Sequence, residues 1–121
     1  MAQMDPKTRE RFLTNLKLHK YTDNTITDLK ALNREFEKIL KNNVAINKEE
    51  YHLGLIGVSV PVWRRDGTAV ATLSIHAPSF RMSVDRALSY VPVLQDSARE
   101  VAVEMGLNDK RKKKAARLSK R

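Results

Sequence analysis

The order of elements along the sequence predicts an α+β domain, with an antiparallel sheet of about three strands packed with two to three helices. Three observations predict this fold class. Apolar residues recur at helical spacing near both ends of the chain, they alternate with small or polar residues through its middle, and the turn dipeptide Asp66-Gly67 separates two alternating runs.

Two helices are predicted in the N-terminal third of the chain. Asp5 followed by Pro6 is a typical helix start, because an Asp side chain caps the first amides and a proline fits the first turn. A second helix is expected over about 28–42, with Thr27 as its cap and Asn43 in a left-handed conformation at its end. Charged residues lie opposite its apolar stripe, which contains Leu29, Leu32, Phe36, Ile39 and Leu40.

A hairpin is predicted in the middle of the chain, after a short strand formed by "VAIN". Its sequence, "IGVSVPVWRRDGTAVATLSIHAP", alternates on both sides of Asp66-Gly67, whose two residues both accept the positive φ of a two-residue turn. Such a turn would pair Gly57 with His76 and Ser59 with Ser74. The apolar side chains would share the opposite face, which helices can cover: Val58, Val60 and Leu73.

The second face of this hairpin is small and polar, and no Lys, Arg, Asp or Glu interrupts it. It carries Gly57, Ser59, Pro61, Thr72, Ser74 and His76. Three interpretations remain open from the pattern alone: the face lines a cavity for a small molecule, it meets solvent, or its Ser and Thr residues serve strand propensity. Pro61 cannot donate a ladder hydrogen bond, so it predicts a bulge or an edge position nearby.

A last helix is predicted over Ser83–Met105 from a long apolar stripe at helical spacing. Pro92 lies inside this segment and predicts a kink or a break, since a proline removes a helical hydrogen bond. Gly106 is expected to end the helix.

Length and composition restrict the classes of function. A chain of 121 residues without cysteine is one domain by length, and it can form neither disulfides nor thiolate metal sites. No apolar run approaches the ~18 residues that a membrane span needs. A cytoplasmic protein without a membrane partner is therefore expected.

The positive charge is concentrated at the C-terminal end of the sequence. The segment 108–121, "NDKRKKKAARLSKR", holds eight Lys or Arg and one Asp, and thus seven of the nine net positive charges. We expect this segment to be a disordered basic tail, because it has too few apolar residues to offset the entropy of ordering. An alternative function is therefore non-specific binding of nucleic acid through the tail, which would weaken with salt.

A set of short motifs in collinear order resembles the effector-binding domain of the isocitrate lyase regulator (IclR) family of bacterial transcription factors. The motifs are threonines Thr22, Thr25 and Thr27 before a helix, Glu50 followed by Gly54, "VSVPVW", Asp66-Gly67, "ATLSIHAP" and a closing helix before Gly106. The resemblance covers about residues 10 to 107 and corresponds to the C-terminal half of that domain.

The resemblance implies a partial GAF-like fold whose cavity binds a small organic effector, often a carboxylate or an aromatic acid. By position, the ligand-binding residues it implies are Asn47, Gly57, Ser74 and His76. The side chains of Asn47, Ser74 and His76 can donate hydrogen bonds to a carboxylate, and Gly57 would leave room for bulk. An aromatic or keto acid is the expected effector, although an acid common near Asn47 in the family is absent here.

The resemblance also implies a domain organisation. Residues 1–107 are expected to form the C-terminal part of an effector-binding domain, followed by the tail. The winged helix-turn-helix of the family and the first half of its effector domain have no counterpart in the sequence. We therefore expect DNA contact only through a missing or separate domain, and homo-oligomers formed through an unpaired sheet edge.

Other site chemistry has weaker support. Glu49, Glu50 and His52 are close in sequence and could bind a metal, but a solvated loop is the simpler interpretation, because no second ligand cluster is present. Ser74 and His76 lack an orienting acid and a nucleophile elbow. We therefore expect no catalytic activity, no metal and no cofactor.

Overall fold

The computed structural model describes residues 1–108 of the 121-residue chain, and it confirms an α+β fold with a three-stranded antiparallel sheet. Among the described residues the structure has four helices, one more than the sequence predicts, because the last helix is divided. In chain order the elements are α1 (Pro6–Thr14), α2 (Leu29–Asn42), β1 (Ala45–Lys48), β2 (Leu55–Trp63), β3 (Ala69–Pro78), α3 (Val84–Ser89) and α4 (Val91–Glu104).

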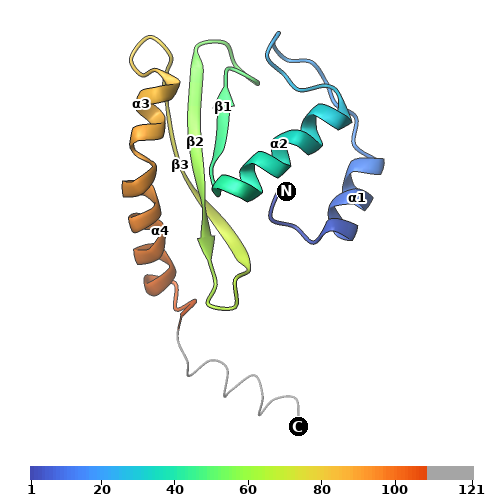
Figure 1. Cartoon of the computed structure of the whole chain (residues 1–121). Coiled ribbons are helices and arrows are strands. Elements are labelled where there is room, and N and C mark those ends of the chain that lie inside the picture. The colour runs from blue at the N-terminus through green and yellow to red at the C-terminus, as the bar shows by residue number, and fades with distance from the viewer. Residues whose placement is uncertain (109–121) are drawn as a thin grey trace.

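The strands lie in the order β1-β2-β3, and the predicted hairpin register is confirmed. Gly57 pairs with His76, Ser59 with Ser74, and Val60 with Leu73. The apolar face of β2 is sealed by α3 and α4, which cover one side of the sheet (Figure 1). The core contains Ile56, Val58, Val60, Val62, Ala87, Leu94, Ala98 and Ala102.

The hairpin turn differs from the two-residue turn that Asp66-Gly67 suggests. The Gly67 amide donates to the carbonyl of Arg64 at 2.9 Å, and Gly67 alone takes a positive φ, of 84°. This is a type I turn followed by a left-handed residue, which makes a longer loop. The register shifts by one residue at Val62/Trp63, so the predicted pairing is restored further along the strands.

The predicted N-cap of the first helix is confirmed, and that of the second helix is wrong by one residue. Asp5 caps α1, and its carboxylate accepts from the amides of Lys7 and Thr8. The cap of α2 is Asp28 and not Thr27, since the Asp28 carboxylate accepts from the Ala31 amide at 2.8 Å. Asn43 ends this helix with the expected left-handed conformation, at φ 54°.

The predicted last helix is broken close to Pro92, as expected. It ends as α3 at Ser89 and resumes as α4 at Val91, so Pro92 stands in the first turn of α4, where no amide hydrogen is needed. Gly106 follows the end of α4 with a φ of 65°.

A second, smaller apolar cluster lies on the other side of the sheet, where α1 and α2 are found (Figure 1). It is formed by Ala2, Leu13 and Phe36, with Leu32 and Ile39 packed against it. The N-terminal segment is held there by two hydrogen bonds, from Arg9 to the Ala2 carbonyl at 2.8 Å and from Gln3 to Asn43 at 3.1 Å.

The expected basic tail, 108–121, falls outside the described residues except for Asn108, so its disorder stays a prediction. Within residues 1–108, no helix is long and apolar enough to cross a membrane.

Candidate functional site

The candidate site is the small, polar face of the sheet, which we call the polar sheet face. The strand register places on it Ala45, Asn47, Gly57, Ser59, Pro61, Thr72, Ser74 and His76. All four residues that the resemblance implies are therefore on one face. Asn47, Gly57 and His76 form one row across the three strands, and Ser74 lies in the next row with Ser59 and Ala45.

Gly57 lies in close contact with the side chain of its cross-strand neighbour, His76. A Cβ atom at this position would lie 2.4 Å from Cδ2 and 2.8 Å from Nε2 of His76, and 3.0 Å from the carbonyl oxygen of Ile75. The imidazole ring of His76 therefore lies directly over the buried Gly57 backbone. The space that a glycine was expected to leave for a ligand is occupied in part by His76 itself.

The two serines of the next row form a hydroxyl pair. Ser59 Oγ and Ser74 Oγ are 2.6 Å apart, and either one can be the donor. Two hydroxyl groups have two protons, and one of these is used between them. The pair therefore retains one proton that can be donated to an acceptor above the sheet.

Asn47 connects the polar sheet face to the loop that follows β1. Its Oδ1 accepts a hydrogen bond from the Glu50 amide at 3.0 Å. The acceptor oxygen of this side chain is thus used within the protein. Its Nδ2 group is the part that can donate to a ligand.

The loop after β1 is held in place by the threonines that precede α2. The buried hydroxyl of Thr22 donates to the Glu49 carbonyl at 2.6 Å, and the Thr25 hydroxyl donates to the Glu50 carbonyl at 2.5 Å. Glu49 adopts a φ of 56°, and its carboxylate accepts from the Gly54 amide at 2.6 Å. These bonds fix the end of the polar sheet face at which Asn47 lies.

The carboxylate of Glu49 has a structural role, because it also accepts from Ser79 Oγ at 3.2 Å and so joins two loops. His52 is exposed and its ring packs edge-on to Tyr51, at 4.5 Å between ring centroids. Among the described residues, no group of three His, Cys, Asp or Glu side chains is placed to hold a metal ion.

Glu50 is the titratable group of this loop with a raised pKa. Burial, which disfavours the charged form, raises the pKa of its carboxyl group above the usual value, and the negative charge of Glu35 acts in the same direction. The amide and the charge of Lys48 oppose this shift.

A hollow of about 580 Å³ lies between the polar sheet face, α2 and the N-terminal segment. Ser59, Pro61 and Thr72 form its sheet wall, Phe36 and Ile39 form its helix wall, and residues 1–5 cover it. The four implied residues do not line this hollow, although Ser59 connects it to Ser74. Strand alternation indicated Ser59 and Thr72, whereas no pattern in the sequence indicated the N-terminal segment.

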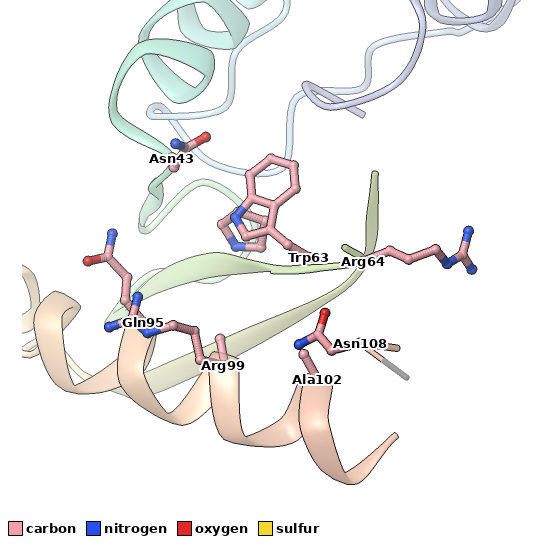
Figure 2. A pocket seen from close by; sticks show the side chains of 9 residues that line it. Asn43, Trp63, Arg64, Gln95, Arg99, Ala102 and Asn108 are labelled. Carbon is pink, nitrogen blue, oxygen red and sulfur yellow. The ribbon is translucent and has the colours of Figure 1, made fainter. Parts of the chain in front are cut away.

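A second hollow, of about 420 Å³, lies at the hairpin end of β2 and shares Asn43 and Pro61 with the first (Figure 2). We call it the Trp63 cleft. It is lined by Asn43, Pro61, Trp63, Arg64, Gln95, Ala98, Arg99, Ala102 and Asn108.

Comparison with known proteins gives a family match over most of the chain. Residues 1–103 match the family described as bacterial transcriptional regulator IclR C-terminal. The chain is 31% identical over 101 residues to a probable transcriptional regulator, SauR, of Cupriavidus necator, covering 84% of this chain and 40% of SauR. It is also 31% identical over 109 residues to the regulator KdgR of Escherichia coli, covering 90% of this chain and 41% of KdgR. The chain thus spans about two fifths of these relatives.

Solved structures with the same fold include the C-terminal domain of Escherichia coli KdgR. It has a TM-score of 0.78 and 31% identity, and the match covers 88% of this chain and 65% of that domain. The IclR of Thermotoga maritima has a TM-score of 0.75 and 31% identity, with 87% and 43% covered. A double mutant of the inducer-binding domain of PobR from Acinetobacter, solved with 3-hydroxybenzoic acid, has a TM-score of 0.77 at 24% identity, with 83% of this chain and 58% of that chain covered.

Proposed function

Because this chain belongs to the IclR family of bacterial transcriptional regulators, as a C-terminal effector-binding domain, we propose that it binds a small organic acid on the polar sheet face and thereby regulates transcription. The observation that carries this proposal is the shared orientation of Asn47, Gly57, Ser74 and His76.

The polar sheet face offers hydrogen-bond donors and no competing acid. The Asn47 amide, the remaining proton of the Ser59–Ser74 pair and an imidazole N–H of His76 can all donate, and none of the eight residues of the face is acidic. Hydrogen bonds to an ionised carboxylate are roughly twice as strong as neutral ones. The face therefore favours an anion with several acceptor oxygens.

An aromatic or keto acid is the proposed ligand class. A flat acid could lie against the His76 ring, which already covers Gly57, with its carboxylate toward the serine pair. The PobR domain of similar fold, solved with 3-hydroxybenzoic acid, supports including aromatic acids in the search.

The proposed partners follow from the family. We expect a homo-oligomer in the bacterial cytoplasm, with DNA bound through a domain that these residues do not provide. We expect no catalytic activity, since the relatives are named as transcriptional regulators.

A thermal-shift screen with pyruvate and 3-hydroxybenzoate tests the proposal. A ligand that binds only the folded state stabilises it by about 2.7 kcal/mol at a hundredfold excess over Kd. We expect a saturable rise in Tm with pyruvate that is lost in His76→Ala and kept in His19→Ala, a matched change at an exposed position. For 3-hydroxybenzoate, the part of the rise that His76→Ala removes reports binding at this face. A rise with pyruvate that persists in His76→Ala would refute binding at this face.

The competing function, non-specific nucleic-acid binding by the tail, predicts a different result. Binding to any duplex would disappear at moderate salt and after deletion of residues 108–121. Acid binding on the polar sheet face would survive both changes.

A further inference from the structure

The Trp63 cleft is a second cavity, and it follows the part of β2 that has no neighbour on one side. Within residues 1–108, β1 pairs with β2 only from Ile56 to Ser59, and no other described strand pairs with that side of β2 from Val60 to Trp63. Figure 2 shows Trp63 and Asn43 on one side of this edge and the α4 side chains on the other.

Small residues keep the cleft open on its helix side. Ala98 and Ala102 are four residues apart, so they lie on the same face of α4, and both are buried at the base of the cleft. A larger side chain at either position would narrow the base of the cleft. Trp63 is half-buried and lines the same cleft, so part of its side chain faces the cavity.

Every polar side chain around the cleft includes at least one N–H donor, and none of its lining residues is acidic. Gln95 and Arg99 are neighbours on α4, and their polar ends extend toward the same side of the cleft (Figure 2). Arg64 extends away from the other lining side chains, so Arg99 is the arginine whose guanidinium group can bind a ligand carboxylate in the cleft.

Arg99 also pairs with Asp96 on α4, but this pair leaves other N–H donors of the guanidinium group available. Both side chains are 70% exposed, and exposed ion pairs of this kind contribute little to stability. A guanidinium group has five N–H donors, so Arg99 can bind Asp96 and a ligand carboxylate at the same time.

We propose that the Trp63 cleft is a second ligand site that binds an aromatic carboxylate; it adjoins the polar sheet face at Pro61 but does not include Ser74 or His76. The ring of the ligand stacks on the indole of Trp63, its carboxylate pairs with Arg99, and the amides of Gln95 and Asn43 contact polar ring substituents. Stacking and charge pairing are both needed, so an acid without a flat ring binds weakly, and so does an aromatic compound without a charge.

The fluorescence of Trp63 provides a direct test, because Trp63 is the only tryptophan of the chain. Benzoate is titrated into the full chain, alongside cyclohexanecarboxylate, which lacks the aromatic ring, and benzyl alcohol, which lacks the charge. We expect a saturable change in tryptophan emission with benzoate, at an affinity at least tenfold above that of either analogue. Equal affinities for all three compounds, or no saturable change with benzoate, would overturn the proposal.

Two matched variants locate the site. Arg99→Gln should weaken benzoate binding roughly tenfold or more, since a hydrogen bond between charged groups contributes about that much. Arg86→Gln, an exposed position on α3 outside the cleft, should leave binding unchanged. An equal loss in both variants would indicate attraction by net charge alone and would also overturn the proposal.

The same titration separates this site from the polar sheet face. Binding at the Trp63 cleft should be unchanged in His76→Ala, and binding at the polar sheet face should be unchanged in Arg99→Gln. If His76→Ala abolishes the tryptophan response and Arg99→Gln does not, the acid occupies the polar sheet face, and the second site is refuted while the proposed function stands.

Discussion

On the polar sheet face, cross-strand pairs of residues are in direct contact through at least one side chain. The buried backbone of Gly57 supports the imidazole ring of His76, and Ser59 shares a proton with Ser74. Alternation along the strands was sufficient to place these residues together. It could not reveal that His76 lies over Gly57, because ring orientation depends on side-chain torsions that a sequence pattern does not contain.

Replacing Gly57 with alanine should displace the His76 ring. The added methyl group would overlap the ring and approach the Ile75 carbonyl, so we expect a loss of about 1–3 kcal/mol in the free energy of unfolding, measured by urea denaturation. The double variant Gly57→Ala/His76→Ser should recover part of this loss, because it removes the ring. Additive losses from the two substitutions would contradict the contact.

Replacing Glu50 with glutamine should stabilise the protein near neutral pH. Burial raises the pKa of the Glu50 carboxyl group in the folded state, so its ionisation opposes folding as the pH rises from its unfolded pKa of about 4.3 through the raised folded pKa. Glu50→Gln should therefore raise Tm at pH 7, and the gain should vanish below about pH 4. Glu37→Gln, at an exposed position on α2, is the control, and an equal gain there would point to overall charge instead.

At the scale of elements, the sequence predicted which segments form helices and strands better than how they are joined. The hairpin register followed from two alternating runs around Asp66-Gly67, whereas the turn itself is longer and a bulge at Val62/Trp63 compensates for it. Two compensating shifts leave the alternation pattern unchanged, so the pattern could not detect them. Similarly, Thr27 and Asp28 are both good capping residues, and only the backbone conformation shows that Asp28 caps α2.

The cap of α2 can be tested by a pair of substitutions. Asp28→Ala should lower the free energy of unfolding by about 1 kcal/mol, because the Ala31 amide loses its acceptor. Thr27→Ala should have little effect, as measured by the same denaturation curves. The reverse order of the two effects would contradict the assignment of the cap.

The hydrogen bonds from Thr22 and Thr25 to the loop after β1 can be tested by substitution. Thr22→Val preserves shape but leaves the Glu49 carbonyl without its donor, so we expect a loss of about 1–3 kcal/mol by urea denaturation. Thr14→Val, at an exposed position at the end of α1, should cost less. If the two variants were equally stable, the Thr22 bond would not hold the loop.

At the scale of the whole molecule, two apolar clusters lie on opposite sides of one sheet. The larger cluster joins β2 to α3 and α4, and the smaller one joins α1, α2 and the N-terminal segment. The sequence predicted the helices of both clusters but not their separation, because an apolar stripe on a helix does not show which side of the sheet that helix covers. The N-terminal segment covers the 580 Å³ hollow, so this part of the site depends on the weaker cluster.

The two clusters should differ in local stability. Amide hydrogens of β2 should exchange slowly, at a rate set by global unfolding, whereas those of α1 and α2 should exchange faster through local opening, because fewer apolar groups hold them. Hydrogen-exchange mass spectrometry measures both regions at once. Equal protection in α2 and β2 would show that the molecule unfolds as one unit.

The central claim is that an organic acid binds on the polar sheet face beside His76. The chain has three histidines, His19, His52 and His76, so NMR of the imidazole groups during a titration with an acid that stabilises the protein can locate the ligand. We predict that the resonances of His76, assigned from the spectrum of His76→Ala, shift and saturate while those of His19 and His52 stay in place. Saturable binding that leaves the His76 resonances unmoved would contradict the claim.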